Sequence, residues 1–406
     1  MSDNSLDVVV IGGGQAGLSV GHELRRRDVD HVILERDRVG SMWRGLWDGF
    51  CINTPNWSLR LPDHPYDGDE PDGFLNREGI VGYIEGYAQL AADTVREGVE
   101  VTSVRAIDGG YSLATSDGPM SAGAVVVCAG AYQAPHRPPG AAELPAGLLT
   151  IDTTSYRNPS ELPDGAVLVV GNGQSGCQIA EELIEAGREV ILSCGRAPWA
   201  PRRIGDHDVV WWAIETGFLD GTVESLPSPA ARLAANVTAS GVAGGHDLHV
   251  RWLRARGVTI VGRFLGCENG RIDFADDLAE TAAWSDARYL DFRGLVSKLC
   301  EERGIEEPAL PDPEPFIADA PRSIPTDGVG SVIFSGGFRH NFQSWVDVPG
   351  GFDVMGFPIQ RDGASSAAPG LFFAGVHFLR TRKSSLLCGV GEDAAIVADG
   401  VRRYLG

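Results

Sequence analysis

The chain is 406 residues long, a length that predicts two or three domains. Its 34 Lys and Arg stand against 55 Asp and Glu, and the net charge of −21 argues against binding nucleic acid or an anionic membrane surface. The seven cysteines show no C-x-x-C spacing, which argues against a disulfide framework, a zinc ribbon or a redox-active dithiol. No apolar run approaches the ~18 residues of a membrane span, and the N-terminal segment does not resemble a signal peptide. We therefore expect a cytoplasmic protein.

Two stretches of the chain, 159 positions apart (8 to 167), repeat each other without a gap. Residues 8–17 (VVVIGGGQAG) fall on residues 167–176 (VLVVGNGQSG), and residues 32–34 (VIL) fall on residues 191–193 (ILS). Each copy has the pattern of a buried strand, a glycine turn, a helix and a second buried strand. The repeat predicts an α/β protein with two Rossmann-like dinucleotide-binding domains.

Each copy contains the motif G-x-G-x-x-G directly after its first strand. In such a motif, the first glycine permits a tight turn, the second lets the backbone approach a pyrophosphate, and the third lets the helix pack on the strand. The helix N-terminus then favours the phosphates electrostatically. We predict that two dinucleotides bind, the alternative being two βαβ units without a nucleotide. The predicted contacts are Gly12, Gly14, Gln15, Ala16 and Gly17 in the first copy, and Gly171, Gly173, Gln174, Ser175 and Gly176 in the second.

The two copies differ at the end of their second strand. The first ends at Glu35, whose carboxylate can accept hydrogen bonds from ribose hydroxyls, so this copy suits FAD or NAD(H). The second has Cys194 at the equivalent position, flanked by Ser193 and Arg196, which could bind a 2′-phosphate. The second copy therefore suits NADP(H), with Arg202 and its neighbour Arg203 as further phosphate ligands. The alternative for Arg196 is a solvated loop arginine.

Three further segments set the domain boundaries. Strands are predicted at 124–128, 331–335 and 370–374, and a last helix from about 391 to 404. We predict an FAD-binding domain in two parts, residues 1–152 and 336–406, with an NADPH-binding domain of residues 153–335 inserted between them. Residues 199–255 carry four tryptophans and are predicted to form an aromatic insertion. It is either a substrate lid or part of a packed core.

Several segments resemble those of the flavin-dependent class B monooxygenases, and are most similar to a group of compact bacterial flavoproteins within that superfamily. Besides the two glycine motifs, they are GSMWR (40–44), TPNW (54–57), VCAG (127–130), YRNP (156–159), FSGGF (334–338) and TRKS (381–384). Two features depart from the family pattern. Asp152 stands where the family's F-x-G-x-x-x-H motif has its histidine, and both hinge-like segments, 128–130 and 335–337, lack their threonine.

The resemblance implies FAD and NADPH as cofactors, and a reaction in which a C4a-(hydro)peroxyflavin transfers one oxygen atom from O2 to a small organic substrate. The oxygen would be added at nitrogen, at sulfur or beside a ketone. The alternative is an NAD(P)H-dependent flavin reductase or oxidase that passes electrons to a carrier or to O2, and a homodimer is left open. A sensor that binds the nucleotides without catalysis is a third hypothesis. Further cofactor contacts are expected at Arg36, Ser41, Met42, Trp43, Val104, Gly130, Gly375 and Val390.

The same resemblance suggests three catalytic residues. Asn53 would hydrogen-bond the oxygen adduct beside the flavin, the alternative being an Asx turn before Pro55. Lys383 and Arg380 precede the last helix and could stabilise negative charge on the reduced flavin, although a surface ion pair is the ordinary role of such residues. His340 and His377 are candidates for contact with nicotinamide or substrate, the alternative being packed histidines. Asp206, His207 and Asp208 are too closely spaced to bind one metal ion, and we expect no metal site.

Overall fold

The two repeated stretches form the centres of two separate sheets, the first mixed and the second parallel. The computed structural model describes residues 5–234 and 236–406. The first copy forms β1 (Ser5–Ile11), α1 (Gln15–Arg25) and β2 (His31–Glu35), and the second forms β11 (Ala166–Val170), α4 (Gln174–Glu185) and β12 (Val190–Ser193). In each copy the two strands pair in parallel. The prediction of two Rossmann-like βαβ units is confirmed.

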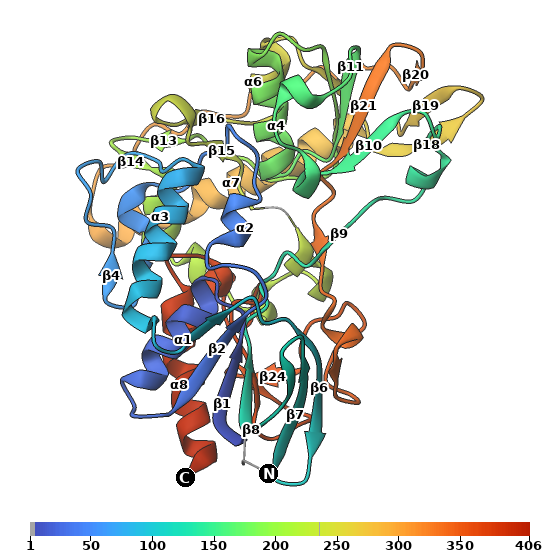
Figure 1. Cartoon of the computed structure of the whole chain (residues 1–406). Coiled ribbons are helices and arrows are strands. Elements are labelled where there is room, and N and C mark those ends of the chain that lie inside the picture. Colours follow the sequence, from blue (N-terminus) through green and yellow to red (C-terminus); the bar gives the residue numbers. More distant parts are fainter. Residues whose placement is uncertain (1–4, 235) are drawn as a thin grey trace.

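The first sheet combines segments from both ends of the chain (Figure 1). Its strands follow the order β23-β6-β7-β8-β1-β2-β5, and β26 pairs in parallel with β8. The strands and helices of this domain, besides those already given, are β5 (Val95–Glu97), β6 (Val101–Ile107), β7 (Gly110–Thr115), β8 (Gly118–Val127), β23 (Val346–Asp347), β24 (Gln360–Arg361), β25 (Ala364–Ser365), β26 (Leu371–Phe373), α2 (Ser41–Arg44), α3 (Arg77–Ala88) and α8 (Val390–Leu405). The C-terminal segment therefore completes the fold that the N-terminal segment begins.

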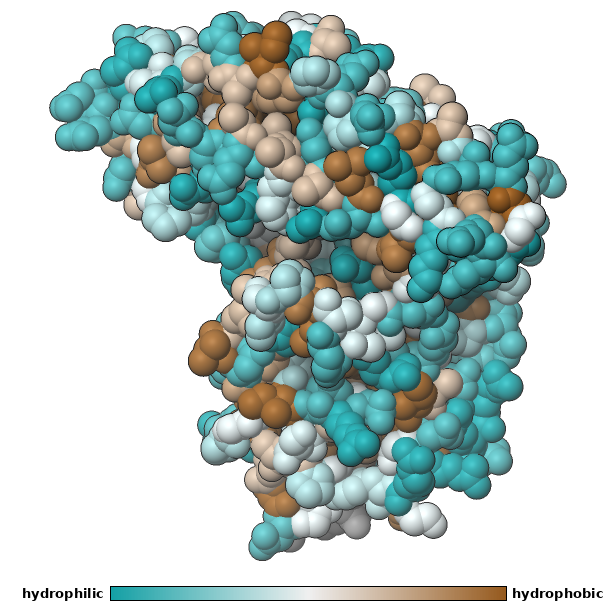
Figure 2. Space-filling view, turned by 180° about the vertical axis from the view of Figure 1, so that it is seen from behind, coloured by the Kyte–Doolittle hydropathy of each residue, from teal (hydrophilic) through white to brown (hydrophobic). Residues whose placement is uncertain are grey.

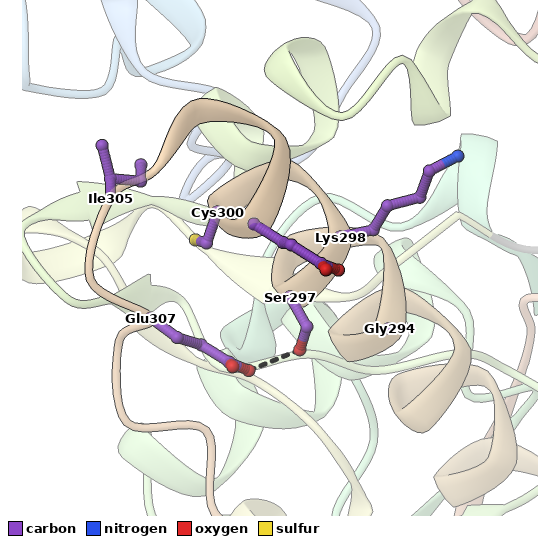
Figure 3. A pocket seen from close by; sticks show the side chains of 7 residues that line it. Gly294, Ser297, Lys298, Cys300, Ile305 and Glu307 are labelled. Carbon is purple, nitrogen blue, oxygen red and sulfur yellow. Dashed lines mark hydrogen bonds between the residues drawn. The ribbon is translucent and has the colours of Figure 1, made fainter.

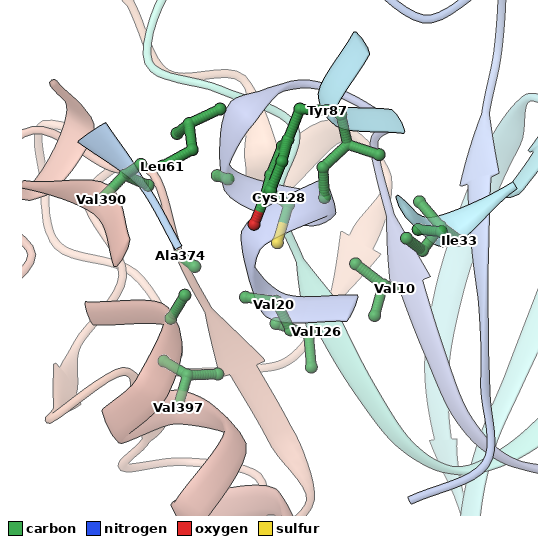
Figure 4. Packing of buried hydrophobic residues seen from close by; sticks show 14 of the residues in the cluster. Val10, Val20, Ile33, Leu61, Tyr87, Val126, Cys128, Ala374, Val390 and Val397 are labelled. Atoms are coloured by element: carbon green, nitrogen blue, oxygen red, sulfur yellow. The ribbon is translucent and has the colours of Figure 1, made fainter. Parts of the chain in front are cut away.

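Both faces of the first sheet are buried, which explains the uninterrupted apolar run of β1. Val8 and Val10 face one core, and Val9 and Ile11 face the other. Figure 4 shows the first of these cores, in which side chains from β1, α1, β2 and β8 meet Ala374 and residues of α8. Since side chains successive along a strand point to opposite faces, an all-apolar strand must be covered on both sides.

The second sheet is entirely parallel and has the order β10-β21-β11-β12-β17. Its remaining strands and helices are β10 (Leu149–Asp152), β17 (Thr259–Val261), β21 (Val329–Phe334), α6 (Val250–Ala255) and α7 (Leu278–Arg303). Strand β10 pairs with β21, so the second domain begins at residue 149. The predicted first segment ends three residues later, at residue 152.

Residues 199–255 form an irregular layer beside the second sheet. The tryptophans pack within it. The ring of Trp199 stacks on Tyr289 of α7 at 4.5 Å, and the buried Trp212 donates its indole N–H to the Ile204 carbonyl at 2.9 Å. Trp199, Trp211 and Trp212 belong to a hydrophobic cluster with residues of α7, and Trp252 packs against the core of the second sheet, as in the second of the two alternatives. The elements of this layer are β13 (Arg203–Ile204), β14 (His207–Asp208), α5 (Val209–Glu215), β15 (Ala239–Ser240) and β16 (His246–Asp247), followed by α6.

Two chain crossings join the domains. In them, β9 (Ala134–Pro135) pairs antiparallel with β22 (Phe338–Arg339), and the His136 N–H donates to the Gly337 carbonyl at 2.9 Å. Figure 2 shows the surface indented between the upper and lower lobes. The small remaining strands are β3 (Arg60–Leu61), β4 (His64–Pro65), β18 (Phe264–Glu268), β19 (Arg271–Phe274) and β20 (Ser323–Pro325). Among the helices of residues 5–234 and 236–406, none has the length and apolarity needed to cross a membrane.

Candidate cofactor and active site

The first glycine turn has the geometry of a dinucleotide cradle. Gly12 has φ of +109°, and a Cβ at this position would lie 2.5 Å from the Cys128 carbonyl oxygen. A Cβ on Gly17 would lie 1.8 Å from the Gly12 carbonyl oxygen, so the helix packs directly against the turn. A Cβ on Gly14, by contrast, would meet no atom within 4 Å. The turn is thus tightly packed at Gly12 and Gly17 and open at Gly14. The open side leaves the space that a pyrophosphate needs at the N-terminus of α1.

Glu35 lies at the end of β2, where the sequence places the ribose contact. One of its carboxylate oxygens accepts a hydrogen bond from the Gly13 N–H at 2.7 Å, and the other accepts from the Asp37 N–H at 3.0 Å. These bonds fix the carboxylate beside the glycine turn and leave further lone pairs for ribose hydroxyls. FAD therefore fits this cradle.

The second glycine turn repeats the first almost contact for contact. Gly171 has φ of +112°, and its Cβ would lie 2.4 Å from the Ser335 carbonyl oxygen. A Cβ on Gly176 would lie 1.8 Å from the Gly171 carbonyl oxygen. Each cradle is closed from behind by the segment that the sequence marks as hinge-like, 128–130 in the first and 335–337 in the second. The second site also fits a dinucleotide.

The four residues predicted to bind the 2′-phosphate are not brought together. Arg203 lies in β13, where its Nη2 donates to the Asp206 carbonyl at 2.9 Å. Ser193 is 2% exposed and donates its hydroxyl to the Gly262 carbonyl at 2.9 Å, so it faces the sheet edge and not a ligand. Arg202 is 1% exposed and lies at the domain interface. Arg196 is on the surface, where its guanidinium pairs with Glu280 at 2.6 Å. The structure thus corrects the predictions for Ser193 and Arg202, and leaves Arg196 as the predicted phosphate ligand.

The remaining predicted flavin contacts have mixed outcomes. Gln15 donates its amide N–H to the Ser385 carbonyl at 3.1 Å, which ties α1 to the segment before α8. A Cβ on Gly375 would lie 2.5 Å from Ala16 Cβ, so the backbone of that segment approaches the first turn closely. Gly130 has φ of +78° in the first hinge, and Val390 begins α8 within the core. The contacts of these residues with FAD stay predictions.

Five other predicted contacts lie in β6, in α2 or in the loop before α2. Val104 is fully buried, and its N–H donates to the Trp345 carbonyl at 2.8 Å, so β23 uses the donor that a cofactor would need. This corrects the prediction for Val104. Ser41, which begins α2, accepts a hydrogen bond from the Arg38 N–H at 3.1 Å. Met42 in α2 is 51% exposed, and the ring of Trp43 lies 6.0 Å from that of Phe50. The exposed Arg36 pairs with Asp37 at 3.3 Å.

Asn53 lies in a loop that bridges the two domains. Its backbone carbonyl accepts a hydrogen bond from Arg202 Nη1 at 2.6 Å, and its half-exposed side chain has no hydrogen-bond partner among the described residues. The predicted Asx turn is therefore not formed, and the amide remains available to a ligand. The guanidinium of Arg202 lies 4.2 Å from the ring centroid of Phe74 and pairs with Asp208 at 2.8 Å. Burial lowers the pKa of Arg202 and raises that of Asp208.

The β15–β16 hairpin, residues 239–247, connects this loop to the second glycine turn. Gln174 exchanges two hydrogen bonds with the Ala239 backbone, at 2.7 and 3.0 Å. Glu181 of α4, which is buried, accepts a hydrogen bond from Ser240 Oγ at 2.9 Å and pairs with His246. Burial raises the pKa of Glu181. Sequence reasoning missed this hairpin, and the only signal was the small-residue run 239–245 (ASGVAGG).

The bonding of Gln174 also changes its predicted role. Both ends of its amide are already occupied by the hairpin, so its side chain positions the hairpin beside the helix N-terminus. The next residue, Ser175, stays half-buried in the first turn of α4. The backbone of this turn, and not the Gln174 amide, is what faces a pyrophosphate.

The basic cluster before α8 is paired with carboxylates. Lys383 Nζ lies 2.8 Å from Asp220 and 2.6 Å from Glu392. Arg380 pairs with Asp362 at 3.2 Å and with the buried Asp393 at 3.1 Å. These ion pairs correct the expectation that Lys383 and Arg380 present free charge to a reduced flavin. They instead fasten the segment before α8 to its surroundings, as in the alternative stated for them.

His377 and His340 lie near the junction of the hinges. His377 Nδ1 lies 2.7 Å from Ser385 Oγ, and its ring packs edge-on against Tyr132 at 5.1 Å. His340 stacks on Phe342 at 5.3 Å, and neither of its ring nitrogens has a hydrogen-bond partner among the described residues. Burial lowers the pKa of each histidine to about 4. Both rings are therefore neutral at pH 7.

Asp152, which replaces the family's motif histidine, is held by an arginine of the first crossing. Arg137 donates two hydrogen bonds to its carboxylate, at 2.8 and 3.0 Å, and the guanidinium lies 4.9 Å from the ring centroid of Phe334. The substitution therefore has a local electrostatic explanation, because Arg137 supplies the opposite charge.

A pocket of about 530 Å³ lies away from both cradles, at the C-terminal end of α7 (Figure 3). Its open lining combines polar and apolar residues, and Ser297 donates a hydrogen bond to Glu307 across it. Within residues 5–234 and 236–406, no group of three or more His, Cys, Asp and Glu could hold a metal ion. All seven cysteines are free thiols, and no two of them have C-x-x-C spacing.

Two glycine cradles that each fit a dinucleotide, in a chain without C-x-x-C spacing, are the features of a flavin-dependent oxidoreductase with a pyridine-nucleotide site. A family model described as pyridine nucleotide-disulphide oxidoreductase matches residues 9–212. The chain belongs to this family. Its members and the flavin-containing monooxygenases use FAD and NADPH, which agrees with the predicted cofactors.

Relatives and solved structures extend this likeness over the whole chain. The sequence is 30% identical to an uncharacterized CzcO-like oxidoreductase of Geobacillus kaustophilus, over 98% of this chain and 99% of that protein. It is 29% identical to the flavin-containing monooxygenase FMO GS-OX5 of Arabidopsis thaliana, over 54% of this chain and 56% of that one. A flavin-containing monooxygenase from Stenotrophomonas maltophilia has the same fold, with a TM-score of 0.68 and 21% identity over 99% of both chains. The resemblance to flavin monooxygenases is confirmed.

Proposed function

We propose that the chain is an FAD- and NADPH-dependent monooxygenase that acts through a C4a-(hydro)peroxyflavin on a small organic substrate, with O2 as the second substrate, in the cytoplasm. Oxygen would be added at nitrogen, at sulfur or beside a ketone. The observation that carries the proposal is the position of Asn53 on a loop held by residues of both domains, with its amide unpaired among the described residues. FAD supplies the reactivity toward hydride and O2, and the protein supplies orientation and electrostatics.

The loop that carries Asn53 is held from both domains. The Cys51 carbonyl accepts a hydrogen bond from Gln178 of α4 at 2.8 Å, and the Asn53 carbonyl accepts one from Arg202. A Cβ on Gly241 of the hairpin would lie 2.1 Å from the Ile52 carbonyl oxygen. The backbone on either side of Asn53 is therefore fixed, so that its amide is preorganised to donate or accept hydrogen bonds at the site.

Exclusion of water favours oxygenation over simple oxidation. An oxygen adduct on the flavin survives only where water is excluded and its oxygens are hydrogen-bonded. The hairpin packs against the Asn53 loop, and the buried Arg202 fills the space behind it. A reductase or oxidase, the alternative function, needs none of these contacts.

The test counts product and H2O2 against the NADPH consumed, for amines, thioethers and ketones offered in turn. We expect at least one class to stimulate NADPH consumption and to give oxygenated product. Asn53→Ala should keep the rate of flavin reduction and divert electrons to H2O2, with product formation falling about tenfold to a hundredfold if one preorganised hydrogen bond is lost.

Two results would argue against the proposal. Wild-type protein that releases one H2O2 per NADPH with every class of substrate would support the oxidase alternative. A fully coupled Asn53→Ala variant would remove Asn53 from the reaction. Asn341→Ala is the matched control, because its backbone N–H bonds to Gln133 and its side chain has no bond among the described residues.

A further inference from the structure

The end of β12 carries an arginine whose charge is already compensated. Arg196 Nη2 lies 2.6 Å from Glu280 Oε1, and the two side chains are 58% and 70% exposed. Glu280 lies in the first turn of α7, far from Arg196 in sequence. An ion pair this exposed is weak and exchanges easily, so the guanidinium can change partners without disturbing the fold.

The neighbouring arginine is compensated in the same manner. Arg263 follows β17, the strand paired with β12, and Asp277 at the start of α7 accepts hydrogen bonds from its backbone N–H at 3.1 Å and its Nε at 3.3 Å. Asp277 thus holds the backbone as well as the side chain of Arg263. Glu280 touches only the guanidinium of Arg196, and it is the carboxylate that can be displaced.

The end of β12 has no acidic residue, and this difference from the first copy gives the ion pair of Arg196 with Glu280 its importance for coenzyme binding. In the first copy, Glu35 lies where a ribose binds, whereas the second copy has the fully buried Cys194 at that point, with Arg196 two residues further on. Ser193 faces inward and Arg202 lies at the domain interface, so Arg196 is the cation left at this position for a 2′-phosphate. Arginine binds phosphate with two parallel hydrogen bonds, and this contact is stronger than an exposed ion pair between arginine and a carboxylate.

We propose that Glu280 is a specificity-determining residue of the pyridine-nucleotide site. Its carboxylate pairs with Arg196 in the free protein, and the 2′-phosphate of NADPH takes its place on binding. The inference rests on the proposed NADPH site. Two consequences follow, because the phosphate must break an existing pair and then lies near a released carboxylate of like charge. Both consequences weaken the binding of NADPH. Neither changes the binding of NADH, which has a hydroxyl in place of the 2′-phosphate.

The test measures equilibrium binding of NADPH and of NADH by coenzyme fluorescence, with purified flavoprotein at low salt. Glu280→Gln keeps the size of the side chain and removes its charge. We expect it to lower the Kd for NADPH by about threefold to tenfold, and to leave the Kd for NADH within about twofold. Glu301→Gln is the matched control, because it removes one charge from the last turn of the same helix, and it should change neither value.

A second variant shows whether the effect passes through Arg196. In the Arg196→Gln background, Glu280→Gln should no longer improve NADPH binding. In protein that keeps Arg196, the improvement caused by Glu280→Gln should become smaller when the salt is raised from about 20 to about 300 mM. The proposal is overturned if Glu280→Gln and Glu301→Gln give the same Kd for NADPH, or if Glu280→Gln improves both coenzymes equally. Bleaching of the flavin by NADPH is recorded in the same samples. Its absence would count against the proposed function, whereas the Kd values decide the role of Glu280.

Discussion

The two glycine turns have the same backbone and opposite side-chain arrangements. In the first, the side chain comes from the strand, and Glu35 reaches back to the Gly13 N–H at 2.7 Å. In the second, it comes from the turn, and Asn172 reaches forward to the Gly195 N–H at 2.8 Å. Gly13 and Asn172 are equivalent positions of the repeat. A Cβ on Gly13 would lie 2.8 Å from Glu35 Cβ, which explains why the first copy needs glycine there and the second does not.

On the proposed assignment of FAD to the first copy and NADPH to the second, this difference separates the ligands by charge. The first copy places a carboxylate at the ribose position, and the second places a neutral amide and leaves room for an arginine nearby. A duplicated fold therefore acquires two specificities through a few side chains, while the glycines that shape the backbone stay in place.

The largest expected effect comes from placing a carboxylate in each cradle in turn. In Gly14→Asp the new side chain enters open space, so the domain should fold, but the charge lies where the FAD pyrophosphate binds. We expect a colourless protein with an unchanged circular dichroism spectrum. Gly173→Asp, at the equivalent position, should give yellow protein whose flavin NADPH no longer bleaches. Loss of flavin from both variants, or from neither, would contradict the assignment of one ligand to each copy.

A large effect on stability is expected where the aromatic insertion, residues 199–255, contacts the first domain. Arg202→Met should lower the free energy of unfolding by about 3–5 kcal/mol, since it leaves Asp208 buried without its partner. Thermal unfolding measures the loss. The double variant Arg202→Met with Asp208→Asn removes both charges and should lose less than Arg202→Met alone. Equal losses would show that the pairing of Arg202 with Asp208 contributes nothing.

A smaller change sharpens the comparison at the ribose position. Glu35→Gln keeps an acceptor for the Gly13 N–H and removes the charge that bonds ribose hydroxyls, so we expect FAD to dissociate about tenfold to a hundredfold more readily. Dialysis followed by absorbance at the flavin band measures this retention. Asn172→Ala is the counterpart in the second copy and should leave flavin retention as in the wild type, because Asn172 bonds only within the second domain.

The features predicted from sequence are those set by local geometry. The glycines of both turns and the strands around them follow from backbone sterics and from uninterrupted apolar runs, both of which act within about thirty residues. The roles of Arg202, Lys383 and Arg380 depend on Asp208, Asp220 and Asp393, carboxylates that only the tertiary fold brings close. From sequence alone, a basic residue near a predicted site can equally well bind a ligand or pair with a carboxylate of the protein. The backbone N–H of Val104 is a similar case, because it donates to the Trp345 carbonyl and not to a cofactor.

The smallest expected effect concerns the second crossing between the domains. Burial lowers the pKa of His340 to about 4, below the ordinary 6.5, so the folded protein binds fewer protons than the unfolded chain between these values. Stability contributed by the neutral ring is therefore complete above pH 6.5 and is lost as the pH falls toward 4. His340→Phe keeps the stacking on Phe342 and cannot be protonated. At pH 5 its unfolding temperature should exceed that of the wild type by about 2 °C or more, and the gap should narrow at pH 7.5. Because the raised pKa of Glu181 affects both proteins alike, it cancels in this difference, and a gap independent of pH would show that His340 does not titrate with unfolding.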